Sequence, residues 1–177
     1  SKIRCIDTVD DESIADLADL AGLPSADEWT SDKNPPYAYY LYYMHANLAK
    51  LNGLLLAKEA RSAPILLKPP AGEAGPSHHL ASAFLFSDGI SHGINLEQHD
   101  DAVALQYLYY ITQMPIAVSP ISNSQLFVKY ASNPFPKLFK RGLCVTLTTD
   151  DPLMFHTSHG SQRPSRVSDR GPQVLGL

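Results

Sequence analysis

Four side chains that can exchange protons or bind a metal ion follow strand-like runs in this sequence. Asp150 and Asp151 come directly after a run rich in β-branched residues, 143–148. Glu73 and His92 lie at or just after the ends of two further runs of this kind. Carboxylates and an imidazole can hold a divalent ion such as zinc, and they can pass protons during hydrolysis. These residue types therefore predict a metal-dependent hydrolytic site, provided that the fold brings them together.

The spacing alone also leaves a purely structural role open for these residues. An Asp-Asp-Pro sequence, as at 150–152, is typical of a turn or a helix cap. A single histidine such as His92 is often a hydrogen-bonded structural group. The other histidines share no spacing, and we expect most of them on the surface or in packing contacts.

The four side chains need a frame of strands and helices to position them. Apolar and β-branched runs predict five strands, at 3–9, 65–68, 90–95, 115–120 and 143–148. Helical patterns fall between them, at 37–60, 78–87, 102–113 and 136–141. Gly142 is predicted as a left-handed helix cap, and 69–76 and 122–124 as loops. This alternation predicts an α/β fold, a parallel sheet with outer helices. A (β/α)8 barrel needs about 250 residues, so five strands make either an open sheet or a partial barrel.

Composition excludes several classes of partner. The 177 residues are 44% hydrophobic and carry a formal net charge of -4. A negative chain without basic clusters is not expected to bind nucleic acid, and no apolar run reaches the roughly 18 residues of a membrane span. Cys5 and Cys144 form no disulfide framework, which predicts a reducing compartment and a cytoplasmic location. The chain starts at Ser1 inside a strand-like run, which predicts a fragment of a longer protein.

Several motifs resemble those of the AMP deaminase family, in the same order and at matching intervals. The resemblance covers about residues 3–156. The motifs are Asn-Pro-Pro-Tyr-Ala-Tyr-Tyr-Leu-Tyr-Tyr at 34–43, Gly-Glu-Ala-Gly at 72–75, Ile-Ser-His-Gly-Ile-Asn-Leu at 90–96, Leu-Gln-Tyr-Leu-Tyr-Tyr at 105–110, Ser-Pro-Ile-Ser-Asn at 119–123, Asn-Pro-Phe at 133–135 and Leu-Thr-Thr-Asp-Asp-Pro-Leu at 147–153.

This resemblance implies a zinc aminohydrolase that converts AMP to IMP and ammonia on a (β/α)8 barrel. The five predicted strands would be barrel strands four to eight. Glu73 would protonate the purine ring nitrogen, and His92 would act as base and orient the attacking water. Asp150 would bind zinc, Asp151 would contact the purine and help orient the water, and Gly72 would place a backbone N–H against the ring. The family resemblance also implies a homotetramer with AMP as its substrate.

The sequence departs from the family pattern at positions that matter for the metal. Pro70 stands where the family has a zinc-binding histidine, and the family's His-x-His pair is absent. Ala71 replaces a cysteine or serine, and Met154 replaces a glutamine near the substrate. Proline cannot ligate a metal ion, and a catalytic zinc normally has about three protein ligands. We therefore expect these 177 residues alone to hold no zinc and to be inactive.

The departures divide the chain and leave more than one function open. Residues 1–156 are predicted as a partial AMP deaminase-like catalytic barrel, and 157–177 as a divergent, disordered tail. One hypothesis is an aminohydrolase whose remaining ligands lie in a longer product. A second is a non-enzymatic pseudo-deaminase that associates with intact AMP deaminase subunits and regulates them. The third is an unrelated α/β binding domain.

Overall fold

Parallel strands joined by helices make up the fold, described by a computed structural model over residues 3–8, 11–14, 20–58, 63–98, 102–150 and 152–155. One sheet pairs β1 (Cys5–Ile6) with β2 (Leu66–Leu67). The other runs in the order β3-β4-β5-β6. Its strands are β3 (Pro70–Ala71), β4 (Ile90–His92), β5 (Ile116–Val118) and β6 (Val145–Leu147), all paired in parallel.

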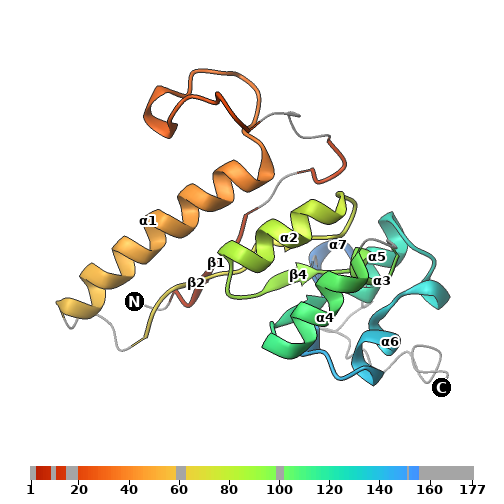
Figure 1. Ribbon diagram of the computed structural model, residues 1–177. Coiled ribbons are helices and arrows are strands. Elements are labelled where there is room, and N and C mark those ends of the chain that lie inside the picture. Colours follow the sequence, from red (N-terminus) through yellow and green to blue (C-terminus); the bar gives the residue numbers. More distant parts are fainter. Residues whose placement is uncertain are drawn as a thin grey trace.

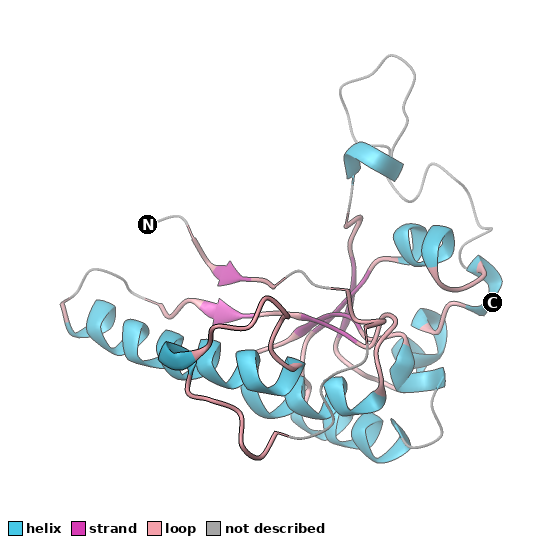
Figure 2. Ribbon diagram, turned by 90° about the horizontal axis from the view of Figure 1, so that it is seen from above, coloured by secondary structure: helices cyan, strands magenta, loops and turns pink. Residues whose placement is uncertain are grey.

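The two sheets are joined through one stretch of chain, because β2 and β3 are separated only by Lys68 and Pro69. The first half of this stretch pairs with β1 and the second half with β4. Strand order therefore follows chain order, as in part of a (β/α)8 barrel. Figure 1 labels β1, β2 and β4, and Figure 2 shows the short β1 and β2 to one side and the other strands nearer the centre with helices around them. The predicted α/β fold with a partial barrel is confirmed.

All five predicted strands are present, each shorter than predicted. The prediction of a loop at 69–76 was wrong for its first residues, because Pro70–Ala71 forms β3. The carbonyls of Pro69 and Ala71 accept hydrogen bonds from the N–H groups of Ser91 and Gly93. The groups that face β4 belong to Pro69 and Ala71, on either side of Pro70, so the missing N–H of Pro70 does not break the ladder.

Helices lie at each of the four predicted places, and the described residues contain three further helices, two of them only four residues long. The confirmed helices are α1 (Tyr37–Ala57), α2 (Ser77–Phe86), α4 (Val103–Thr112) and α6 (Phe135–Lys140). The prediction of a loop at 122–124 was wrong, because these residues belong to α5 (Pro120–Leu126). Proline suits the first turn of a helix, where its missing N–H would have no partner. The short elements are α3 (Asn95–Gln98), α7 (Pro152–Phe155), and the 3-10 turns Ala26–Glu28 and Tyr130–Ser132.

The core lies between the strands and the helices that cover them. Side chains from α1, α2, α4 and α6 pack on residues of the sheet, and α1 lies along α2 (Figure 1). Tyr109 is fully buried, and its hydroxyl donates to the Leu80 carbonyl at 2.9 Å. The fully buried apolar side chains include Leu41, Leu67, Leu80, Ile90, Ile116, Val118 and Leu138.

The ends of the strand order are open within the described residues. There, β1 pairs with β2 and β6 pairs with β5, and neither has a second partner. Leu147 on β6 is 42% exposed. No helix in the described ranges has the length and apolar character needed to cross a bilayer. The predicted tail at 157–177 lies outside the described residues.

The cap at Gly142 gives a direct test of the local backbone. Gly142 has φ 83°, as predicted for a left-handed cap, and an added Cβ would lie 3.3 Å from Tyr110 Cε2. We expect Gly142→Ala to lower the free energy of unfolding by about 1 kcal/mol, because alanine is strained in this conformation. Gly53→Ala is the control, since Gly53 lies within α1 with nothing within 4 Å of an added Cβ. There alanine should raise stability by roughly 0.5–1 kcal/mol. Urea denaturation of both variants checks the prediction. A change in the free energy of unfolding of the same sign in both variants would contradict it.

Candidate active site

Three of the four side chains singled out in the sequence meet at the carboxyl ends of the parallel strands. Glu73 follows β3, His92 ends β4 and Asp150 follows β6. One ligand atom from each of these residues lies within 4.8 Å of the other two. Strands of a parallel sheet all end at the same edge, which explains why residues so far apart in sequence converge. Asp151 lies outside the described residues, and its role stays a prediction.

Glu73, His92 and Asn123 form a compact triangle of polar atoms. Glu73 Oε1 lies 3.1 Å from His92 Nδ1, and Asn123 Nδ2 donates to Glu73 Oε1 at 2.8 Å. Asn123 Nδ2 is also 3.1 Å from His92 Nδ1. His92 Nδ1 can donate to the glutamate or accept from the amide, but it cannot do both at once. The tautomer of His92 and the protonation of Glu73 are therefore linked, which suits a pair that exchanges a proton.

Asp150 is oriented by the same short helix that supplies Asn123. Ser122 Oγ donates to Asp150 Oδ2 at 2.9 Å, and Ser122 and Asn123 are both fully buried. The two side chains reach the site because α5 begins directly after β5. Sequence reasoning missed both roles, although the Ser-Pro-Ile-Ser-Asn motif just after a predicted strand was an available signal.

Unusual backbone geometry is concentrated at this site. Among the described non-glycine residues, positive φ occurs at His92 (73°), Gln113 (53°) and Asp150 (58°). A non-glycine residue in the left-handed region costs about 1–2 kcal/mol, and such strain tends to cluster at functional sites. Two of the three strained residues belong to the proposed site, which supports its functional assignment.

A third carboxylate borders the site from the first strand. Asp7 follows β1, and partial burial raises the pKa of its carboxyl group above the ordinary value. The Thr8 N–H and the charge of His92 act in the opposite direction, and Asp150 adds to the rise. The charges of His92 and Asp150 therefore both act on the pKa of Asp7. Its position beside the site was not predicted from the sequence.

Gly72 and Pro70 occupy the strand and turn that carry Glu73. Gly72 has φ 69°, and an added Cβ would come within 2.7 Å of Leu80 Cδ2, so no side chain fits there. Its N–H donates to Glu12 Oε1 at 2.9 Å, and a substrate atom would have to share this donor. The predicted contact of Gly72 with a purine ring stays a prediction. Pro70 lies in β3, and its carbonyl accepts from the Tyr37 hydroxyl at 2.7 Å.

The chemistry of the donors fits a divalent metal ion. Two carboxylates and one imidazole are ligands that such ions accept, and the three groups are already close together. Pro70 contributes no donor to this set. Fold and site together define the class: part of a (β/α)8 barrel whose strand ends carry donors that fit a metal ion.

Comparison with known proteins identifies the family within that class. The AMP deaminase family profile matches residues 1–162, and the chain belongs to this family. It is 51% identical over 152 residues to an AMP deaminase of Dictyostelium discoideum, covering 85% of this chain and 18% of that protein. It is 50% identical over 151 residues to human AMP deaminase 3, covering 85% of this chain and 19% of that protein. The chain thus spans about a fifth of the length of these relatives.

A solved structure supports the fold assignment. The crystal structure of an adenine deaminase from Arthrobacter aurescens matches with a TM-score of 0.56 and 25% identity. The match covers 71% of this chain and 35% of that protein. The strand arrangement described above is therefore shared with a deaminase of known structure.

The left-handed backbone at His92 is expected to reverse the usual order of stability between an alanine and a glycine variant. His92→Gly and His92→Ala both remove the imidazole, but only glycine adopts the observed φ of 73° without strain. We expect the glycine variant to be more stable by about 1 kcal/mol. Ser91 on β4 is the control, and there alanine should be more stable than glycine by roughly 0.5–1 kcal/mol. Urea denaturation of the four variants decides, and an alanine variant at least as stable as glycine at position 92 would contradict the strain.

Proposed function

We propose that this chain forms the C-terminal part of the catalytic barrel of an AMP deaminase, which hydrolyses AMP to IMP and ammonia. The observation that carries the proposal is the contact of Glu73 Oε1 with His92 Nδ1 at 3.1 Å, beside Asp150 at the carboxyl ends of the strands. A proton-exchanging pair next to a possible metal ligand is what hydrolytic deamination needs. The relatives named AMP deaminase support AMP as the substrate.

The proton transfers can be assigned to this chain's own residues. The oxygen of water bonds to the purine carbon that bears the amino group, and His92 accepts a proton from that water. Glu73 gives its proton to the neighbouring ring nitrogen. The amino group then leaves as ammonia with the proton of the new hydroxyl, which becomes the carbonyl of IMP. His92 returns its proton to Glu73 across the 3.1 Å contact, and the pair is ready for another turnover.

Two further residues are proposed to hold the substrate. Asp151 would contact the purine and help to orient the attacking water. Gly72 would present its N–H to the ring, sharing it with the carboxylate of Glu12. Ser122 supports this arrangement indirectly, since it donates to Asp150, the neighbour of Asp151.

Zinc is the metal that we propose for this site, with Asp150 as the ligand that this chain contributes. When bound, zinc lowers the pKa of a coordinated water toward neutrality, so that hydroxide is available at ordinary pH. Pro70 occupies the position of a family ligand, and we propose that the other ligands come from parts of the barrel outside these 177 residues. The enzyme would be a cytoplasmic homotetramer. Cys5 and Cys144 are both free thiols, which supports a reducing compartment.

Pro70 favours a second candidate function. A subunit that keeps the barrel but lacks a metal ligand could join intact AMP deaminase subunits and regulate them as a pseudo-deaminase. The retained geometry of Glu73, His92 and Asp150 supports the catalytic proposal instead, because a regulatory subunit has no need of this arrangement.

Exchange of this segment into a relative tests the catalytic proposal. The 152 aligned residues of this chain would replace their counterpart in the Dictyostelium enzyme, with Pro70 kept or changed to histidine. We expect the Pro70→His chimera to release ammonia from AMP and to bind zinc. The Pro70 chimera should be at least about 100-fold slower, because loss of a ligand costs no less than loss of a supporting group. Pro70→Ala is the control for the backbone, and it should behave like Pro70.

Two outcomes would overturn the proposal or redirect it. A Pro70→His chimera that folds and binds zinc without releasing ammonia would contradict the roles given to Glu73 and His92. In an active chimera, Glu73→Gln should lower kcat by roughly 100- to 10,000-fold, the range of a general acid. A Pro70 chimera that is inactive, yet changes the kinetics of intact subunits in mixed tetramers, would support the regulatory function.

A further inference from the structure

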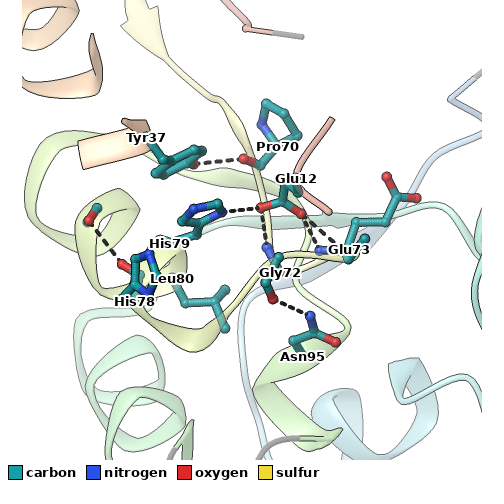
Figure 3. Close-up of polar contacts among 12 residues, drawn as sticks. Glu12, Tyr37, Pro70, Gly72, Glu73, His78, His79, Leu80 and Asn95 are labelled. Carbon is teal, nitrogen blue, oxygen red and sulfur yellow. Dashed lines mark hydrogen bonds and ion pairs between the residues drawn. The ribbon is translucent and has the colours of Figure 1, made fainter. Parts of the chain in front are cut away.

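The loop that carries Glu73 is held by a glutamate 61 positions earlier in the chain. Glu12 is only 8% exposed, and its carboxylate accepts three successive backbone N–H groups (Figure 3). Oε1 accepts from Gly72 at 2.9 Å, and Oε2 accepts from Glu73 at 2.7 Å and from Ala74 at 3.2 Å. Consecutive N–H groups that point into one concavity form an anion-binding nest, and here its anion is a side chain of the same protein.

A second layer of side chains holds Glu12 in place. His79 Nδ1 lies 3.4 Å from Glu12 Oε1, and both side chains are almost fully buried. The Tyr37 ring stacks on the His79 ring with centroids 4.2 Å apart, and the Tyr37 hydroxyl donates to the Pro70 carbonyl. Gly75 makes room for this layer, since an added Cβ would lie 2.5 Å from His79 Nδ1. Figure 3 shows Glu12 between His79 and the turn at Gly72 and Glu73.

The charge of Glu12 is maintained in this buried place. Burial alone would raise its pKa, but the contact with His79 and the three backbone N–H groups outweigh burial and lower it. An ionised carboxylate is a stronger acceptor than a neutral amide or acid, which suits a site with three donors.

The backbone and the side chain of Glu73 have separate partners. Its N–H bonds to Glu12, while its carboxylate reaches His92 and Asn123. We propose that Glu12, braced by His79, is a positioning residue that fixes the Gly72–Ala74 backbone and thereby aims Glu73 at His92. This inference rests on the proposed function for the catalytic meaning of Glu73, whereas the backbone clamp itself does not depend on it.

Glu12→Gln is the informative variant because it keeps the shape of the side chain and removes its charge. One oxygen of the glutamine can still accept, but its NH2 group then faces an N–H donor of the loop. Leaving a buried donor without a partner is costly, so the loop is expected to shift. Glu28→Gln is the matched control, since Glu28 is exposed and its carboxylate accepts from the nearby Ser25 hydroxyl, far from the Gly72–Ala74 backbone in sequence.

The first measurement uses the 177-residue chain itself and needs no activity. In Glu12→Gln we expect amide exchange at Gly72, Glu73 and Ala74 to accelerate at least about 10-fold, since their bonds to the carboxylate are weakened. The side-chain NH2 resonances of Asn123 should move in the same direction as in Glu73→Gln, because that amide reports the position of the Glu73 carboxylate. Unchanged exchange and unchanged Asn123 resonances would overturn the inference.

The second measurement separates positioning from general stability in the active Pro70→His chimera. Glu12→Gln should lower kcat about 10- to 100-fold with KM changed less than threefold, and Glu12→Asp should recover part of the loss. In a Glu73→Gln background, Glu12→Gln should lower kcat less than threefold, because Glu12 acts through Glu73. Equal losses in both backgrounds would show a purely structural role. If Glu12→Gln fails to fold, Glu12→Asp is taken through the same cycle.

The two proposals fail in different ways. A chimera without activity removes the catalytic interpretation but leaves the exchange and resonance measurements to decide on the clamp. An active chimera that is indifferent to Glu12→Gln removes the inference and leaves the proposed function intact.

Discussion

A carboxylate buried in a protein stabilises the fold only when the groups around it replace the water that it has lost. Glu12 meets this condition with three backbone N–H groups and a histidine. Several neighbouring features follow from that requirement. Gly75 has no side chain because His79 needs the space, and the ring of Tyr37 covers His79 on its other side. Glu12 thus holds the turn at Gly72–Ala74 that leads to the site.

Much of the frame could be predicted from the sequence, because strands and helices leave local patterns. Apolar, β-branched runs marked the strands, and Gly142 marked a helix end. Pro70 was misread as loop, since proline is rare in strands and nothing local shows that its two neighbours, rather than Pro70 itself, bond to β4. Ser122 and Asn123 were misread because their polarity suggests exposure, whereas Glu73 and Asp150 supply them with buried partners.

The candidate site was partly predictable for the same reason. Glu73, His92 and Asp150 could be selected because parallel strands place their carboxyl ends together. Glu12 could not, because it sits in an acidic cluster typical of a solvated turn. Its partners are about 60 residues further along the chain, and no local pattern links them.

Pro70 is compatible with the backbone arrangement around Glu73 and His92. Proline has no side-chain donor for a metal ion, and at this position its strand pairs with β4 and its carbonyl bonds to Tyr37. The contact between Glu73 and His92 is retained beside it. A proline at the proposed ligand position therefore coexists with the backbone that carries the proposed acid and base.

The left-handed backbone at His92 and Asp150 also limits which residues can replace them during evolution. Only glycine, asparagine, aspartate and, less often, histidine adopt that conformation readily. Most single substitutions at these two positions would weaken the fold before they could offer a new reactive group. Replacements at positions 92 and 150 are therefore limited mainly to glycine and a few polar residues, so a new reactive group would more readily arise at other positions.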